Sequence, residues 1–418
     1  MLRQISYAGV LLILCACASQ SAPDLGAQPE AEAVSLAHKY LVVDTHIDVP
    51  FRLYRNAADV SQATDGGDFD YPRAAAGGLD ALFMSIYIPA AVDTDGQART
   101  LADDLIDLVE GLVEAAPDKY QMATCAADVD TIRAAGKIAF PMGMENGAPL
   151  EGSFDNLEHF RQRGVRYITL AHSKSNHISD SSYDPEEPWG GLSPFGKTLI
   201  AAMNERGVMV DVSHISDNAF WQVLELTATP IIASHSSLRH FTPGFIRNMS
   251  DEMVTALKDN GGVVQINFGS GFLTADAHAY RGASQAAYLR FQADADLPDD
   301  DPAMKAFSAS YRLEHPYPYA DLNDVLDHID RAVELTGIDH VGLGSDYDGV
   351  GDSLPNGLKD VQAYPNLAAG LQARGYSEND IAKILGGNIM RVWREVEAYA
   401  QNKGYPPLCR QANPASPS

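Results

Sequence analysis

Short, nearly continuous apolar runs alternate along the chain with segments of helical periodicity. Uninterrupted apolar runs are typical of strands buried on both faces of a parallel sheet, because such strands have no solvent-facing side. Eight such runs cover residues 40–46, 79–88, 138–145, 164–172, 207–214, 230–235, 261–268 and 340–346. Helical spacing fills intervals between them, as in residues 98–116 and 323–337. We therefore predict an α/β fold of eight βα units, a single-domain (β/α)8 TIM barrel with long loop insertions.

Two long segments interrupt this alternation. Residues 173–195, rich in Ser, Asp and Pro, follow the fourth run, and residues 269–320, an acidic insertion with helical patches, follow the seventh. Loops of this length in a compact domain usually serve as lids or binding walls. After the eighth run, residues 376–400 predict one final helix, which begins with a cap formed by Ser377 and Asp380.

The N-terminus has the pattern of an export signal. One arginine near the start precedes an apolar stretch over residues 8–16, which is too short to span a bilayer, and small and polar residues follow. The sequence Leu-Cys-Ala-Cys that ends at Cys17 resembles the bacterial lipoprotein signal, in which Cys17 is lipidated after cleavage. Soluble secretion is the alternative. We expect an exported protein, lipid-anchored on the periplasmic side of the bacterial outer membrane.

This interpretation divides the chain into four parts. A signal peptide over residues 1–17 is followed by a tether over residues 18–35, the barrel over residues 36–400 and a C-terminal tail over residues 401–418. Two cysteines, Cys125 and Cys409, remain in the mature chain beyond the lipoprotein signal. An oxidising compartment permits a disulfide between them, but the sequence alone does not establish that they are close.

The chain is strongly acidic. It has 418 residues, with 56 Asp and Glu against 30 Lys and Arg, and a formal net charge of −26. This balance argues against a nucleic-acid partner, which requires a basic surface, and against electrostatic docking on anionic lipids. Much of the acid lies in solvated patches such as residues 294–301, which we interpret as a contribution to solubility.

Candidate metal-binding or proton-transferring residues lie at the ends of six of the eight runs. They are His46 with Asp48, Glu145, His172, His214, His235 and Asp346. Active sites of barrels are built at the carboxyl ends of the strands. A single histidine at such an end is more often a hydrogen-bonded structural residue. Convergence of several N and O donors on one barrel mouth is better explained by a bound cation, because unpaired buried charge is costly.

The residue types indicate two divalent ions. Three histidines with Asp and Glu, and no Cys, suit zinc, but five ligands are too many for one catalytic zinc ion. We expect His46 and Asp48 to bind one ion and His214 and His235 to bind the other, with Glu145 bridging both. A water molecule between two such ions becomes hydroxide near neutral pH and can attack a polarised substrate.

The motifs that carry these residues resemble those of the membrane dipeptidase (renal dipeptidase) family of zinc peptidases. The matching stretches are DTHIDVP, GMENG, GLSPFGKTLIAAMNERGVMVDVSHIS, SHSS, RNMSDEM, GSDYDG and GGNIMRV, in family order from about residue 40 to 395. Asp48 in place of a second histidine is a specific mark of this family among amidohydrolase-type barrels. The resemblance implies a binuclear zinc metallopeptidase that hydrolyses L-L and L-D dipeptides by means of a metal-bridging hydroxide.

The resemblance also implies roles for residues outside the metal ligands. His172 resembles the histidine that stabilises the oxyanion, and Asp346 the residue that moves protons between water and the leaving amine. Arg247 resembles the guanidinium that grips the terminal carboxylate of the substrate. Asn146, where many relatives have Gly, and the long insertion over residues 269–320 depart from the family pattern and bear on side-chain preference. We expect dipeptides as the substrates. We also expect that the protein can form a homodimer.

Two other functions fit parts of the pattern. Another binuclear amidohydrolase-type barrel could act on non-peptide amides, lactones or phosphoesters, but it would usually carry His-x-His and a carboxylated lysine after the fourth strand. The chain offers His172 there, with Lys174 two residues later. A non-enzymatic zinc-binding lipoprotein would have no need for Arg247 or Asp346. Function is not set by fold alone.

Overall fold

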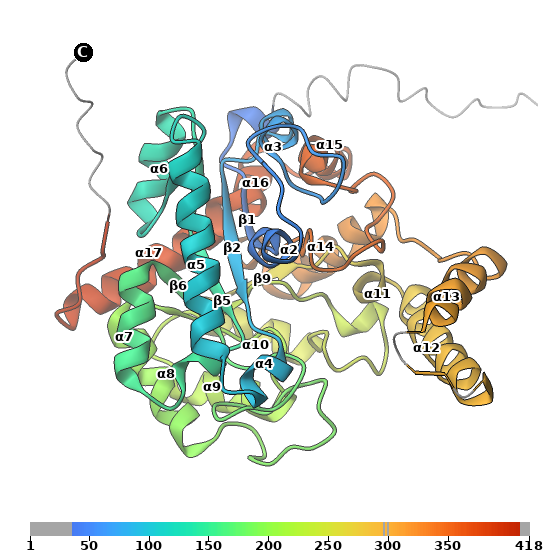
Figure 1. Cartoon of the computed structure of the whole chain (residues 1–418). Coiled ribbons are helices and arrows are strands. Elements are labelled where there is room, and N and C mark those ends of the chain that lie inside the picture. Colours follow the sequence, from blue (N-terminus) through green and yellow to red (C-terminus); the bar gives the residue numbers. More distant parts are fainter. Residues whose placement is uncertain (1–35, 296, 299–300, 410–418) are drawn as a thin grey trace, which may run out of the picture.

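A single curled sheet with parallel pairing forms the centre of the molecule (Figure 1). The computed structural model describes residues 36–295, 297–298 and 301–409. In these residues the sheet has ten strands, which are β1 (Val43–Ile47), β2 (Ala81–Tyr87), β3 (Tyr120–Met122), β4 (Ile138–Phe140), β5 (Met142–Glu145), β6 (Val165–Thr169), β7 (Met209–Asp211), β8 (Ile232–Ala233), β9 (Val263–Ile266) and β10 (Val341–Leu343). Their residues are almost all buried, as the apolar runs predicted.

Eight of these strands form the barrel. They pair in the order β1-β2-β5-β6-β7-β8-β9-β10, and β4 and β3 extend the sheet beside β2. The ends of this order meet just beyond β1 and β10, where the Asp346 amide donates to the His46 carbonyl (3.0 Å) and the Asp48 amide donates to the Tyr347 carbonyl (2.9 Å). All eight predicted strands are confirmed. The run over residues 138–145 makes two strands because Pro141, which has no amide proton, lies between them.

Helices connect the strands and surround the sheet (Figure 1). They are α2 (Val49–Arg55), α3 (Tyr71–Gly77), α4 (Ala90–Thr94), α5 (Ala98–Ala115), α6 (Ala126–Ala134), α7 (Phe154–Arg163), α8 (Pro194–Arg206), α9 (Asp217–Leu226), α10 (Asp251–Asn260), α11 (Ser270–Leu273), α12 (Ala275–Ala295), α13 (Pro302–Glu314), α14 (Leu322–Thr336), α15 (Tyr364–Ala373), α16 (Glu378–Ala382) and α17 (Asn388–Asn402). The helices α5 and α14 confirm the two predicted from periodicity. Among the described helices, none is both long and apolar enough to span a membrane.

The final helix differs from the prediction of one continuous helix over residues 376–400. The predicted cap is present, because Ser377 and Asp380 form a reciprocal capping box at the start of α16. A π-helical turn over Lys383–Gly387 then separates α16 from α17. At this turn Gly386 lies against the start of the barrel, where a Cβ would come within 2.7 Å of the Leu41 carbonyl oxygen. The close approach of the two backbones therefore requires glycine and accompanies the local change of helical pitch.

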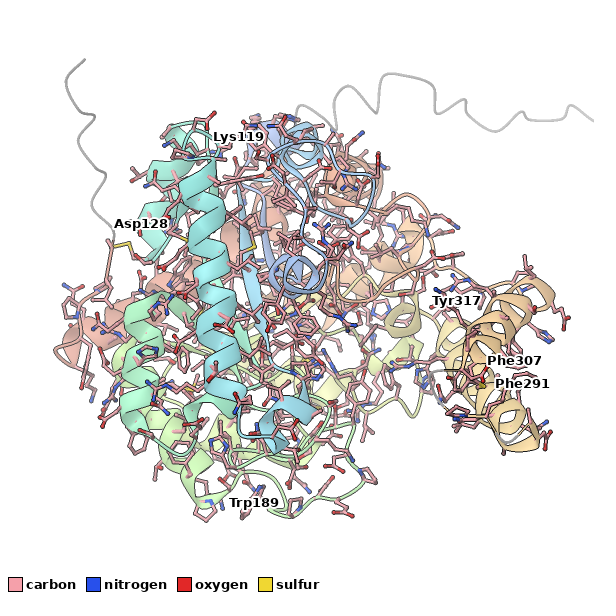
Figure 2. The ribbon with its side chains drawn as sticks, viewed as in Figure 1. Lys119, Asp128, Trp189, Phe291, Phe307 and Tyr317 are labelled. Carbon is pink, nitrogen blue, oxygen red and sulfur yellow. A yellow bond between two sulfur atoms is a disulfide. The ribbon has the colours of Figure 1, made fainter. Side chains whose placement is uncertain are left out.

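The two predicted insertions have different structures. Residues 173–193 form turns and bends, and α8 begins at Pro194, inside the range predicted as loop. The longer insertion contains α11, α12 and α13. The last two lie side by side and project from the barrel (Figure 1), and the rings of Phe291 and Phe307 stack between them with centroids 4.4 Å apart (Figure 2).

The described part of the C-terminal tail is attached to the barrel. A disulfide joins Cys409 to Cys125 at the start of α6 (Figure 2). Arg161 on α7 donates to the Pro406 carbonyl (2.9 Å), and the Thr124 hydroxyl donates to the Leu408 carbonyl (2.6 Å). These contacts fasten residues 405–409 to the barrel. The predicted lipoprotein signal with Cys17 lies outside the described residues.

Candidate metal centre

The seven polar residues predicted at the strand ends lie together at the carboxyl end of the barrel. They are His46 in β1, Asp48 directly after β1, Glu145 at the end of β5, His172 after β6, His214 after β7, His235 after β8 and Asp346 after β10. Five of them line a cavity of about 960 Å³, and His46 and His235 lie buried behind its surface. Parallel strands bring their carboxyl ends to one side of a sheet, so residues far apart in sequence meet here.

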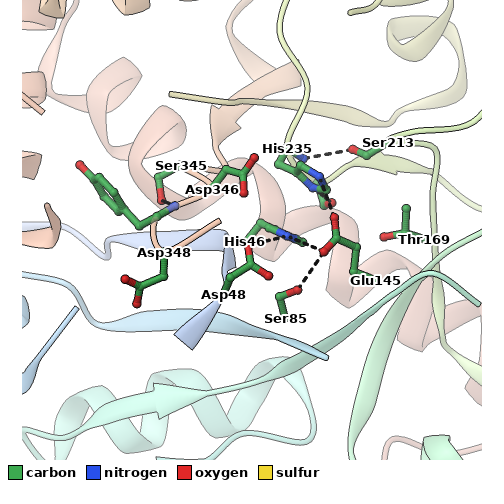
Figure 3. Close-up of polar contacts among 12 residues, drawn as sticks. His46, Asp48, Ser85, Glu145, Thr169, Ser213, His235, Ser345, Asp346 and Asp348 are labelled. Atoms are coloured by element: carbon green, nitrogen blue, oxygen red, sulfur yellow. Dashed lines mark hydrogen bonds and ion pairs between the residues drawn. The ribbon is translucent and has the colours of Figure 1, made fainter. Parts of the chain in front are cut away.

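Glu145 contacts four histidines of this group, of which Figure 3 labels His46 and His235. Its Oε2 atom is 3.5 Å from His46 Nε2 and accepts a hydrogen bond from Ser85 Oγ at 3.3 Å. Its Oε1 atom lies 3.2 Å from His214 Nε2 and 3.3 Å from His235 Nε2. The two oxygens of this carboxylate therefore face different histidines.

His46 is held by its second ring nitrogen. The Tyr167 hydroxyl lies 2.8 Å from His46 Nδ1 and donates its own proton to the Thr45 carbonyl at 3.0 Å. Because that proton is used, the hydroxyl accepts from His46 Nδ1–H, and Nε2 carries the lone pair. This buried Nε2 atom has no hydrogen-bond partner among the described residues and lies 3.5 Å from Asp48 Oδ2. Such an atom is suited to a metal ion.

A similar chain of hydrogen bonds orients His235. The Ser234 hydroxyl donates to Asp211 Oδ2 at 2.6 Å, so it accepts from His235 Nδ1–H at 2.8 Å. His235 Nε2 then carries a lone pair and lies 2.8 Å from His214 Nε2. Burial is the main cause that lowers the pKa of both His214 and His235 well below the ordinary value, which favours neutral rings that can bind a metal.

The buried carboxylates among these seven residues favour a bound cation. Burial alone would raise the pKa of Glu145, but His172, His46 and the other histidines outweigh it and hold the pKa well below the usual range. Burial also lowers the pKa of His46, whereas Tyr167, Glu145 and Asp48 together raise it above the ordinary value. The carboxylates of Glu145 and Asp48, which attract a proton to His46, would attract a metal ion in the same way.

The donor atoms fit divalent metal. Three overlapping groups of residues could each hold an ion, because their ligand atoms, one from each residue, all lie within 4.8 Å of one another. The groups are His46, Glu145 and His235; Glu145, His172 and His214; and His46, Asp48 and Asp346. All are imidazole nitrogens or carboxylate oxygens, the donors that borderline divalent ions accept.

Asp346 lies at the edge of the group with its backbone in the left-handed region (φ 63°). Its Oδ2 atom accepts from Asn267 Nδ2 at 2.7 Å. Burial and the nearby charge of Asp48 raise its pKa well above the usual range, so it is suited to hold a proton. A Cβ on Gly349 would come within 2.3 Å of Asp48 and 2.1 Å of Asp346, so the absent side chain lets these carboxylates approach.

Arg247 lies beside the centre and not on the cavity surface. Its side chain is buried, Nη1 donates to Ser236 Oγ (2.7 Å), and Nη2 donates to the His235 carbonyl (2.8 Å). Its Nε atom is buried with no hydrogen-bond partner, and among the described residues no carboxylate lies within 4.0 Å of the guanidinium. Burial lowers its pKa, while Tyr183 and Asp346 oppose this effect. A buried cation without an anionic partner is costly and calls for an anion.

Several residues that shape the centre escaped the prediction. Asn267 and Tyr167 were missed because amide and phenol groups are not typical metal ligands, and Ser234 and Asp211 act only through His235. A usable signal was available for Asn267, which directly follows the end of β9. Gly349 lies within the quoted motif GSDYDG.

Comparison with known proteins identifies the family. The model of the family described as "Membrane dipeptidase (Peptidase family M19)" matches residues 30–405. The chain is 34% identical to dipeptidase tcpJ of Claviceps purpurea, covering 83% of this chain and 74% of that protein, and 34% identical to dipeptidase aclJ of Aspergillus oryzae, covering 80% and 72%.

Solved structures agree with this result. The crystal structure of the probable dipeptidase PvdM from Pseudomonas aeruginosa is 31% identical, with a TM-score of 0.77 over 89% of this chain and 99% of that one. A metallopeptidase structure, dipeptidase AC, is 25% identical, with a TM-score of 0.70 over 85% and 98%. These matches confirm the predicted barrel. The chain therefore belongs to the membrane dipeptidase family of metallopeptidases.

Proposed function

We propose that this metal-dependent dipeptidase uses two zinc ions to hydrolyse dipeptides, including those with a D-residue at the C-terminal position. The observation that carries the proposal is the position of Glu145, whose two carboxylate oxygens face His46 on one side and His214 and His235 on the other. Bound zinc would activate water and polarise the scissile carbonyl. His46 and Asp48 would hold one ion, His214 and His235 the other, and Glu145 both.

Two residues that line the cavity would act on the reacting atoms. His172 Nε2 lies 3.4 Å from Glu145 Oε1 at the cavity surface, where an imidazole N–H can stabilise the developing oxyanion. Asp346 has a raised pKa and can take a proton from the attacking water and deliver it to the leaving amine. Asn267 orients the carboxylate of Asp346 through its hydrogen bond to Oδ2.

Arg247 would bind the terminal carboxylate of the dipeptide. Its guanidinium is buried beside the centre without an anionic partner among the described residues, and a substrate carboxylate would provide one. Such an interaction fixes the position of the C-terminal residue relative to the metal centre.

The alternative with a carboxylated lysine is not favoured by the position of Lys174. This side chain is largely exposed, its ammonium group lies 3.2 Å from Asp184, and it does not line the cavity. A non-enzymatic zinc-binding protein would not explain why the buried guanidinium of Arg247 has no carboxylate partner among the described residues. We therefore retain dipeptide hydrolysis as the proposed reaction.

We also propose that the protein is exported and carries lipid on Cys17, on the periplasmic side of the outer membrane. The sequence pattern described above supports this location, and the disulfide between Cys125 and Cys409 suits an oxidising compartment. Assembly as a homodimer stays a prediction.

The reaction can be tested with the purified, zinc-loaded protein. We expect hydrolysis of L-L and L-D dipeptides, loss of activity on chelation and recovery with Zn²⁺, because activation of the water depends on the ions. Lactones and phosphoesters assayed in parallel test the other barrel chemistry. Full dipeptidase activity in a sample verified as metal-free would contradict the mechanism.

A further inference from the structure

The part of the cavity wall outside the candidate metal group has more arginines than carboxylates, although the protein is acidic. This part is lined by four arginines and two aspartates, whereas the whole chain has a net charge of −26. Two of the arginines are neutralised at the cavity wall. Arg52 Nε lies 2.8 Å from Asp348 Oδ2, and Arg312 Nη2 lies 2.8 Å from Asp352 Oδ2.

Arg55 and Arg281 account for the remaining charge. Among the described residues, no carboxylate lies within 4.0 Å of either guanidinium. Arg55 is the last residue of α2, and Arg281 lies on α12, the first long helix of the insertion. Both are exposed and line the cavity, and Arg281 also hydrogen-bonds the Tyr183 side chain. Guanidinium groups in this setting favour an anionic ligand.

Of the two arginines, Arg281 is better placed to bind a second carboxylate of a substrate whose α-carboxylate is bound by Arg247. Its guanidinium lies over the ring of Tyr183, 5.9 Å from the centroid. The Tyr183 ring packs against Phe245 (centroids 6.1 Å apart) and Phe245 packs against Phe272 (5.7 Å). The Arg247 guanidinium lies over the Phe272 ring at 5.5 Å, so both guanidinium groups border one aromatic cluster. Tyr183 and Arg281 both line the cavity, so a carboxylate side chain in the part of the cavity beside Tyr183 could reach Arg281.

We propose that the preferred substrates are dipeptides with an acidic side chain on the C-terminal residue, and that Arg281 binds the side-chain carboxylate. This inference rests on the proposed function, in which Arg247 binds the α-carboxylate of the same residue. The cavity of about 960 Å³ has room for such a side chain beyond the reacting bond. Arg281 is then a specificity-determining residue supplied by the insertion, and the insertion forms one wall of the substrate site.

The test compares isosteric acid and amide substrates. For the zinc-loaded protein, kcat/KM is measured for Ala-Glu and Ala-Gln with the C-terminal residue in L and D form, and for Glu-Ala and Gln-Ala. We expect kcat/KM for Ala-Glu to be about two to five times that for Ala-Gln, the scale of a partly exposed charge pair. Arg281→Gln should reduce this ratio to about one, and added salt should reduce it in the wild type.

A matched control lies on the same helix. Arg290 is nine residues beyond Arg281, which at 100° per residue places it on the opposite face of α12, and it does not line the cavity. Arg290→Gln should leave the ratio unchanged. An unchanged ratio in Arg281→Gln, or a loss caused instead by Arg55→Gln, would overturn the assignment to Arg281. A wild-type preference confined to Glu-Ala would also overturn it, whereas no hydrolysis of any dipeptide would refute the proposed function itself.

Discussion

At the scale of single residues, hydrogen bonds to the second ring nitrogen determine what two histidines can bind. The Tyr167 hydroxyl accepts a hydrogen bond from His46, and the Ser234 hydroxyl accepts one from His235. Each hydroxyl in turn donates a hydrogen bond, Tyr167 to the Thr45 carbonyl and Ser234 to the Asp211 carboxylate. Both rings therefore direct Nε2 toward Glu145. The hydrogen bonds to the second ring nitrogen fix the orientation of the two imidazoles, which reduces the cost of assembling a metal site.

Substitution of Arg247 tests recognition of the substrate at this scale. Arg247→Met should lower kcat/KM for a dipeptide by about 2–3 kcal/mol, because a charge-assisted contact with the terminal carboxylate is lost. The zinc content should stay that of the wild type. The corresponding dipeptide amide has no carboxylate to bind and should lose far less. Equal losses on the acid and the amide would mean that Arg247 only supports the loop through Ser236 and the His235 carbonyl.

At the scale of elements, the last helix and the tail clamp one side of the barrel. The α17 residue Glu397 accepts from the backbone N–H of Ala126 at the start of α6 (3.1 Å), next to the residue that forms the disulfide with Cys409. Burial raises the pKa of Glu397 from 4.5 to about 7, although the Ala126 amide and Arg166 favour the ionised form. The carboxyl group is thus more easily protonated in the folded protein than in the unfolded chain.

This shift gives a pH dependence of stability with a definite sign. A carboxyl group with a raised pKa in the folded state stabilises that state relative to the unfolded chain at low pH, and this contribution is lost as the pH rises from about 4.5 through about 7. Glu397→Gln should remove this loss. With the disulfide intact, the melting temperature of the variant relative to that of the wild type should therefore be higher at pH 8 than at pH 5. The exposed neighbour Glu395 provides a control, and an equal difference at both pH values would exclude ionisation of Glu397 as the cause.

At the scale of the whole molecule, the sequence predicted best the strands that are buried on both faces of the sheet, because burial on both faces requires an uninterrupted apolar run. Such strands must be apolar, so a His or Asp at the end of a run stands out, and His46, Glu145 and His235 were predicted from that contrast. Contacts between distant segments left no comparable pattern. Cys125 and Cys409 are 284 residues apart, and their proximity depends on how α17 packs. The π turn at Gly386 and the projection of α12 and α13 likewise depend on tertiary packing.

The central claim is that Glu145 bridges two zinc ions, and the zinc content of wild type and Glu145→Gln, measured side by side, tests it most directly. The account predicts about two tightly bound zinc ions per wild-type chain. The amide offers one neutral oxygen in place of a carboxylate that serves both ions, so Glu145→Gln should weaken both sites and lose more than one ion together with nearly all dipeptidase activity. Two tightly bound zinc ions and normal turnover in Glu145→Gln would contradict the bridging role.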